Sequence, residues 1–402
     1  MVYSRSEIAQ FIEEEDVKFI RLAFVDVFGR QKNLSIMRDE LESAFDQGVS
    51  FDASRASGFE NVDSDLVLRP EVETIAVLPW RPDRGRVVRM FCSLERPDGS
   101  PYECDTRAVL KRALADAHAL DVSFRFGAEM EFYLFQRDEH GVATKRPFDL
   151  AGYMDVTPLD KGENFRRQVC LTLEQMGIKP KSSHHEAGPG QNEIDFQSFD
   201  PLSAADAAVT FRFVVNTIAS ANGLFADFSP RPLADQPGNG LRLTVAARAN
   251  GREDVASQVL AGLLEHVYES TLFYNPVAES YSRFGHDADL SYITWSKDSR
   301  ASLARVPSRL GVRERVELRS PDSTCNPYLA YALAIWSSLD GIARNLSAPV
   351  ESFYSHGAVT SSPSHKLPQN IEEARAAASR SEFIANRIPE PILRSYLASS
   401  AR

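Results

Sequence analysis

The sequence of 402 residues predicts an α+β protein, with a small N-terminal domain joined to a larger domain built on an antiparallel sheet. Amphipathic helical patterns alternate with strand patterns along the larger part of the chain, and a turn-rich segment separates the first 100 residues from the rest. Alternating charged and apolar side chains, typical of strands with one polar and one apolar face, occur in three stretches: 127–135, 193–196 and 315–319.

Residues 1–100 are expected to form the small domain. Ser4 and Glu7 make a capping box at the start of a short amphipathic helix over 6–15. The segment 95–101, with its proline and glycine residues, is the expected linker. The other expected elements are a hairpin (19–27 and 31–36), a loop (51–59) and three strands (65–68, 74–78 and 86–94).

Residues 101–402 are expected to form the larger domain. Asp105 caps a helix that reaches about Leu120, and Asn326-Pro327 begins another with proline in its first turn. Because the strands between the helices carry acidic faces, the polar face of the sheet is expected to form a cleft. The expected helices are 163–176, 203–221, 252–272 and 326–344, followed by two that close the chain, 371–379 and 381–388.

Composition narrows the range of partners and compartments. A net charge of −11 argues against nucleic acid or an anionic membrane as the main partner. The most apolar helix, around 328–336, is too short and too polar to span a bilayer, and the N-terminus has no secretory hydrophobic segment. The four cysteines have neither disulfide nor metal spacing, so a cytoplasmic protein with reduced cysteines is expected.

Carboxylates gather on the polar faces of the predicted strands. Glu129 and Glu131 are two apart on one strand, which places them roughly 6.6 Å from one another. Glu186 and Glu193 flank a Gly-Pro-Gly turn, and Glu317 lies in the third alternating stretch. One such strand alone is more often a solvated sheet face. Three with strongly apolar opposite faces favour a site for Mg²⁺ or Mn²⁺, which prefer carboxylate oxygens.

Four motifs in order give the chain a family resemblance. They are Gly-x-Glu-x-Glu-Phe-x-Leu-Phe at 127–135, His-His-Glu-x-x-x-Gly-Gln-x-Glu at 184–193, Arg-x-Glu-x-Arg at 315–319 and Asn-Pro-Tyr-Leu at 326–329. Together they resemble the glutamine synthetase family of the bacterial class. The resemblance implies a β-grasp-like domain over 1–100 and a catalytic domain over 101–402. It also implies ATP and Mg²⁺ or Mn²⁺, and assembly into hexameric or dodecameric rings.

The resemblance also implies roles for individual residues. Glu131, Glu186 and Glu193 match the ligands of the first metal, and Glu129 and Glu317 match ligands of the second. The other matches are catalytic Asp52, Arg300 and Asp289 (with Asp287 as the other candidate), substrate-binding Tyr153, Glu186, Arg283 and Arg319, and ATP-binding Arg305 and Arg315.

Several positions depart from the family pattern. The family's second metal also needs a histidine, but Arg242 stands there, and Thr244 replaces a histidine on the nucleotide side. A lysine expected three residues before Arg315 is Val312, and the loop after Asp52 carries Arg55. A guanidinium has no lone pair to give a metal. Either Arg242 forms an ion pair with Glu129, Glu317 or both, or it points to solvent and water replaces the histidine on the metal.

Two functions therefore stay open from the sequence. The first is an ATP-dependent ligase that joins the side-chain carboxylate of glutamate, or a related acid, to ammonia or an amine through an acyl phosphate. The second is a catalytically weak or inactive homologue that serves as a binding, regulatory or structural subunit. By resemblance, Asp52 serves the ammonium site of a neighbouring subunit, so a closed ring is expected.

Overall fold

The computed structural model describes residues 4–59, 62, 64–81, 84–252, 254–285, 290–309, 312–313, 315–355, 358–360 and 365–399. Helices and mixed sheets confirm the predicted α+β class. The chain forms two compact units. The first is Met1–Val109 with Leu171–Ile178, and the second is Leu110–Cys170 with Lys179–Arg402. The domain boundary near residue 100 stays a prediction.

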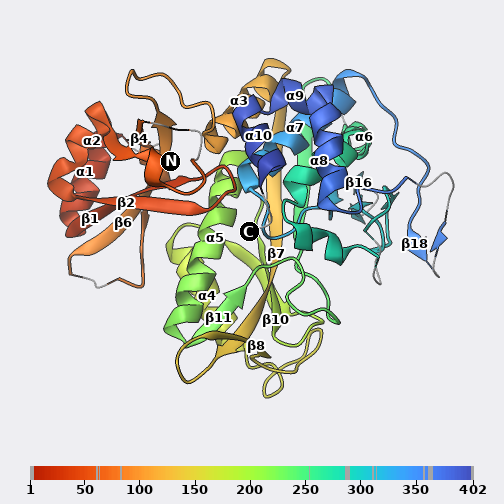
Figure 1. The fold of residues 1–402 in the computed structure, drawn as a ribbon, viewed down its shortest axis with the longest axis horizontal. Coiled ribbons are helices and arrows are strands. Elements are labelled where there is room, and N and C mark those ends of the chain that lie inside the picture. Colours follow the sequence, from red (N-terminus) through yellow and green to blue (C-terminus); the bar gives the residue numbers. More distant parts are fainter. Residues whose placement is uncertain are drawn as a thin grey trace. The chain divides into compact units, whose positions relative to one another are not determined.

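A six-stranded sheet organises the first unit, with strand order β2-β1-β6-β4-β3 and β5 paired to β6. The predicted hairpin is present, and the Ser4–Glu7 capping box begins α1. Figure 1 shows α1 and α2 in red beside this sheet. The elements are α1 (Arg5–Glu14), β1 (Val17–Val25), β2 (Gln31–Met37), α2 (Leu41–Gln47), β3 (Val49–Asp52), β4 (Asp65–Pro70), β5 (Ala76–Val77) and β6 (Arg86–Glu95).

Two predictions for this unit were partly wrong. The expected loop 51–59 begins with the end of strand β3 and a 3₁₀ turn, because β3 pairs with β4, a distant partner that local sequence does not reveal. The expected strand 74–78 is shortened to β5, since the 3₁₀ turn Val72–Thr74 precedes it. Helix α2 was not predicted, because it is short and has no side-chain cap.

Strand β7 (Val122–Arg137) is the spine of the second unit. It pairs antiparallel with four strands, and the nine-stranded sheet has the order β13-β14-β17-β12-β7-β10-β9 with β8 and β11 also on β7. The other strands are β8 (Ala143–Pro147), β9 (Pro180–His185), β10 (Gln191–Phe196), β11 (Leu224–Asp227), β12 (Leu241–Ala249), β13 (Trp295–Ser296), β14 (Ala304–Arg305) and β17 (Val316–Leu318). The segments on either side of the predicted Gly-Pro-Gly turn contain β9 and β10, which pair antiparallel.

Helices α5 and α7 pack their side chains on the apolar face of this sheet. Phe211 of α5 contacts Phe132 at a ring-centroid distance of 5.8 Å, and Tyr331 of α7 contacts Phe126 at 5.1 Å. Such edge-to-face contacts leave the opposite face of β7 to its glutamates. The helices predicted for this part of the chain are confirmed as α3 (Thr106–Ala119), α4 (Glu163–Gln175), α5 (Pro201–Ala221), α6 (Ala256–Tyr274) and α7 (Pro327–Ala343).

Three helices, not two, close the described chain, and Figure 1 shows them in blue: α8 (Ile371–Arg380), α9 (Glu382–Arg387) and α10 (Glu390–Ala398). The prediction missed α10 because its first turn contains prolines. Proline is tolerated there, since the N–H groups of a first turn have no intrahelical partner.

One helix in the described residues is long and apolar enough to cross a membrane by length and composition alone. This is α5, with a mean hydropathy of 1.2, and 61% of the qualifying window is buried inside the protein. Its apolar side chains therefore contribute to the core, where Phe211 and Val215 are fully buried.

Candidate active site

The glutamates predicted as metal ligands meet on one face of the sheet. In the antiparallel register, Glu193 of β10 lies opposite Glu131 of β7, and Asp195 lies opposite Glu129. Directly paired residues share a sheet face and lie about 5 Å apart at Cβ. The side chains of Met130 and Ile194, which alternate with these carboxylates along the two strands, point to the opposite face of the sheet and are fully buried. Strand pairing therefore fixes four carboxylates in one patch.

Glu131, Glu186 and Glu193 form a strongly interacting acidic cluster. Burial and the negative charges of Glu131 and Glu186 raise the pKa of Glu193 to about 10. Burial and the negative charge of Glu186 also raise the pKa of Glu131. The backbone N–H of Gly240 donates to Oε2 of Glu131 at 2.7 Å and opposes this rise, because it stabilises the charged form. Oxygen Oε2 of Glu193 is buried without a hydrogen-bond partner. This donor set fits a divalent cation, because bound positive charge would satisfy these oxygens.

His184 adds a nitrogen to this cluster. Its Nε2 lies 2.9 Å from Oε1 of Glu186 and 3.8 Å from Oε1 of Glu193. The three residues bring possible ligand atoms within 4.8 Å of one another. Tyr153, which is half exposed, packs edge-to-face on the His184 ring at 5.4 Å. The predicted substrate residues Tyr153 and Glu186 therefore both contact His184.

Arg242 points to the position next to Glu129. It forms an ion pair with Oε2 of Glu129, and its Nη2 lies 3.5 Å from Oε2 of Glu193. The expected ion pair with Glu129 is thus confirmed. Burial and the positive charge of Arg319 lower the pKa of Arg242 to about 9, which leaves the guanidinium charged at neutral pH.

Glu317 is paired with a different arginine. Arg305 donates from Nε to Oε2 at 2.8 Å and from Nη2 to Oε1 at 3.2 Å, and Arg315 lies 3.5 Å from Oε1. Burial alone would raise the pKa of Glu317, but the bonds to Arg305 outweigh it and hold the pKa below its usual range. Glu317 therefore pairs with Arg305 and not with Arg242.

Arg283 and Arg319 flank the acidic cluster. Their positive charges oppose the rise in the pKa of Glu131. Arg283 is held by Asn275 and by the carbonyl oxygen of Ser320, at 3.1 and 3.2 Å, while Nε of Arg319 is buried without a hydrogen-bond partner. The unpartnered donor of Arg319 suits carboxylate or phosphate binding.

The remaining predicted catalytic residues are Arg300, Asp52 and Asp289. Arg300 is exposed, and its positive charge contributes to lowering the pKa of Arg242 and Arg319. Asp52 belongs to the first unit, where its Oδ1 accepts a hydrogen bond from the backbone N–H of Ser54 at 3.1 Å. Asp289, like Asp287, lies outside the described residues.

A cavity of about 390 Å³ opens beside Glu129. Two cationic side chains, Lys181 and Arg315, and two hydroxyl groups, from Ser198 and Thr244, reach its wall. Cations and hydroxyls are the donors that phosphate and ribose oxygens require. Its full lining is Gly127, Ala128, Glu129, Lys181, Phe196, Gln197, Ser198, Thr244 and Arg315.

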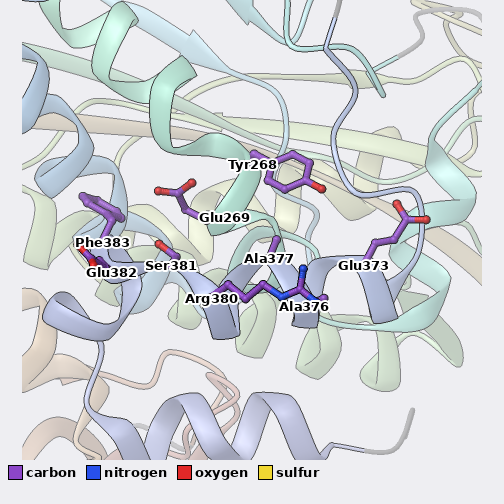
Figure 2. A pocket seen from close by; sticks show the side chains of 9 residues that line it. All are labelled: Tyr268, Glu269, Glu373, Ala376, Ala377, Arg380, Ser381, Glu382 and Phe383. Atoms are coloured by element: carbon purple, nitrogen blue, oxygen red, sulfur yellow. The ribbon is translucent and has the colours of Figure 1, made fainter.

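A second cavity, of about 580 Å³, lies between α6 and the α8–α9 segment. Figure 2 shows Arg380 and Glu373 on α8, with Tyr268 and Glu269 facing them from α6. Glu269 already forms a hydrogen bond with His266, and Glu373 accepts one from the side chain of Asn370, the N-cap residue of α8. None of the predicted site residues lines this cavity.

Sequence reasoning gave no role to three residues that the structure brings into the site. Asp195 alternates with Glu193, so its face was predictable, although its pairing opposite Glu129 required the register. His184 stands within the quoted motif, but a histidine beside a glutamate is common without a function. Lys181 precedes the alternating pattern and carries no local signal.

Comparison with known proteins agrees with these features. Residues 16–97 match the family described as glutamine synthetase, beta-Grasp domain, and residues 103–402 match glutamine synthetase, catalytic domain. The chain is 40% identical to a glutamine synthetase of Clostridium saccharobutylicum, covering 99% of this chain and 94% of that protein. It is 37% identical to a glutamine synthetase of Methanosarcina mazei, covering 98% and 93%.

Solved structures show the same fold. A structure described as a GmaS/ADP complex superimposes with a TM-score of 0.86 at 25% identity, covering 99% of this chain and 94% of that one. A Plasmodium falciparum glutamine synthetase gives a TM-score of 0.86 at 19% identity, covering 99% and 95%. With both domain families matched along the sequence and close relatives covered nearly end to end, this chain belongs to the glutamine synthetase family.

Proposed function

We propose that this protein is an ATP-dependent ligase that joins the side-chain carboxylate of glutamate, or of a related acid, to ammonia or an amine. The observation that carries the proposal is the acidic cluster of Glu131, Glu186 and Glu193, flanked by Arg283 and Arg319. Mg²⁺ or Mn²⁺, when bound there, would neutralise charge on the phosphates of ATP. A solved relative described as an ADP complex supports the assignment of the nucleotide.

The reaction has two steps. A carboxylate oxygen of the acid attacks the γ-phosphorus of ATP, which forms an acyl phosphate and releases ADP. The nitrogen of ammonia or an amine then attacks the carbonyl carbon, and the bond to phosphate breaks. Arg319 and Arg300 hold the acid and the transferred phosphoryl group, while Lys181 and Arg315 meet the phosphates at the 390 Å³ cavity.

The proton released from the amine goes to Asp52. We assign this residue to the site of a neighbouring chain, so that the active assembly is a closed ring, and we place the enzyme in the cytoplasm. Arg55, after Asp52 in the sequence, and Tyr153 border the amine pocket in this proposal. They make an amine larger than ammonia a specific possibility to test.

The test is phosphate release by the purified protein with ATP and Mg²⁺ or Mn²⁺. Glutamate with ammonium comes first, followed by a panel of acids and amines. We expect release that depends on both co-substrates and that falls at least ~100-fold in Glu131→Gln, which removes a ligand charge. Asp195→Asn is the comparison on the same face, since no role in holding the first metal is given to Asp195.

A second candidate function is that of a non-catalytic homologue. The pairing of Arg242 with Glu129 supports it, because the family's second metal would have to displace this arginine. No turnover with any acid and amine, in protein that still binds ATP and assembles, would favour this candidate over the ligase.

A further inference from the structure

We infer that this chain binds a single divalent cation, at Glu131, Glu186 and Glu193, and that the guanidinium group of Arg242 occupies the position where the family holds a second metal. The inference rests on the proposed function only for the identity of the metal site. It concerns how many cations the site takes, which is measurable without turnover.

The sheet register places Arg242 beside the second-metal residues. Arg242 lies directly opposite Glu129 in the β12–β7 pairing. Two residues along the same strand, Thr244 lies opposite Glu317, which in turn lies opposite Arg305 of β14. Opposed residues and residues two apart on a strand share one face, so all five side chains belong to the same surface.

Each second-metal carboxylate already has an arginine partner. Arg242 is paired with Glu129, and Arg305 binds both oxygens of Glu317 at 2.8 and 3.2 Å. The charges of these two pairs sum to zero. The side chains of Arg242 and Glu129 are 16% and 17% exposed, so water screens them only weakly. A divalent cation would therefore meet no net negative charge and two fixed guanidinium groups.

A different ligand set near Glu129 is blocked in the same way. Glu129, Glu193 and Asp195 bring carboxylate oxygens within 4.8 Å of one another. However, Arg242 contacts Glu129 and lies 3.5 Å from Glu193, and these are two of the three members of this set. Arg242 is thus the common obstacle to a second metal on this side of the cluster.

Arg242 rather than Arg305 is the deciding residue. Arg305 has a counterpart among the arginines of the family, whereas Arg242 replaces a metal-binding histidine. Guanidinium offers no lone pair and stays protonated, so Arg242 cannot act as a ligand in any protonation state reached at neutral pH. The single positive charge of the Arg242 side chain thus occupies the position of an exchangeable divalent cation.

The first-metal cluster presents the opposite situation. Glu131 accepts a hydrogen bond from the backbone N–H of Gly240, and Glu186 lies 2.9 Å from Nε2 of His184. Arg283 and Arg319 lie near Glu131, but among the described residues neither forms an ion pair with the three carboxylates. One oxygen of Glu193 is buried without a hydrogen-bond partner. A cation bound here gains charge compensation that Arg242, at 3.5 Å from Glu193, supplies only in part.

The test is a count of Mn²⁺ ions bound per chain by the full-length protein, with metal alone and no nucleotide. Electron paramagnetic resonance measures free Mn²⁺ during the titration. We expect one Mn²⁺ per chain for the natural protein and for Arg242→Lys, which keeps the charge. Arg242→His should bind two, with magnetic coupling between the ions, and Glu193→Gln should lose the tight site.

A matched control is Arg248→His, which makes the same change at an exposed position on the same strand and should leave the count at one. Two Mn²⁺ per chain in the natural protein would overturn the inference. A count of one in folded Arg242→His would overturn the role given to Arg242. Absence of ligase turnover with a count of one would refute the proposed function and leave this inference standing.

Discussion

Replacing Arg242 with methionine should destabilise the fold, because it leaves Glu129 beside two other carboxylates without its cation. Removing one partner of a fully buried ion pair costs about 3–5 kcal/mol, whereas exposed pairs contribute at most about 1 kcal/mol. The side chains of this pair are 16% and 17% exposed, close to the buried case. We therefore expect a loss of about 3 kcal/mol in the free energy of unfolding.

A double-mutant cycle separates the ion pair from the lost packing of the arginine stem. In Glu129→Gln, Arg242 keeps its neighbour Glu193 at 3.5 Å, so a loss of about 1 kcal/mol is expected. The loss in the double variant should be smaller than the sum of the two single losses by about 2 kcal/mol, which is the coupling energy of the pair. Urea unfolding followed by tryptophan fluorescence, at one fixed protein concentration, gives the four values.

A coupling energy below about 0.5 kcal/mol, the level of residues that do not interact, would contradict the pair. Equal destabilisation in Arg242→Lys and Arg242→Met would also contradict it, since lysine keeps the charge. In that case, packing of the arginine stem would explain the loss.

The other predictions concern the nucleotide cavity and the helices. Lys181→Ala should raise the KM for ATP about fivefold, or about 1 kcal/mol, with kcat little changed, while Lys179→Ala should leave KM unchanged; steady-state kinetics checks both. Burial lowers the pKa of His266, but hydrogen bonds to two carboxylates raise it above 6.5 overall. Protonated His266 therefore stabilises the fold fully below pH 6.5, and this contribution is lost as the pH rises through the raised pKa. His266→Gln should lower the free energy of unfolding by about 1.5 kcal/mol at pH 5.5 and by less at pH 9, measured by urea unfolding. Gly262→Ala should lower the free energy of unfolding by about 3 kcal/mol, because the new Cβ would lie 2.0 Å from a carbonyl oxygen of α7. Ser257→Ala, at an exposed position on the same helix, should change it by less than about 0.5 kcal/mol, and thermal melting compares the two variants.

Period-two alternation predicted the strands that form the site. It placed Glu129 and Glu131 on one face of what became β7, and Arg242 and Thr244 on one face of β12. What alternation could not supply was which strands are neighbours. The pairing of Asp195 with Glu129 depends on antiparallel register, which is set by contacts far apart in the sequence.

The sequence also could not predict which arginine pairs with which glutamate. Arg242 could have paired with either Glu129 or Glu317, and the sequence left both open. In the structure, Glu317 pairs with Arg305, which lies directly opposite it on strand β14. This position could not be predicted, because β14 has only two residues. Likewise, α10 was missed because prolines stand at its start, and β3 was missed because it depends on a partner strand distant in the sequence.

The way Gly240 holds Glu131 has a consequence for the divergence of this family. The carboxylate of Glu131 accepts from the backbone N–H of Gly240, and the Ser323 hydroxyl donates to carbonyl oxygens of both residues, at 3.0 and 2.9 Å. In these bonds, Gly240 contributes main-chain atoms only. Substitutions of the side chains at 242 and 244 therefore leave the bonds between Gly240 and Glu131 available, even where they change the ion pairs nearby.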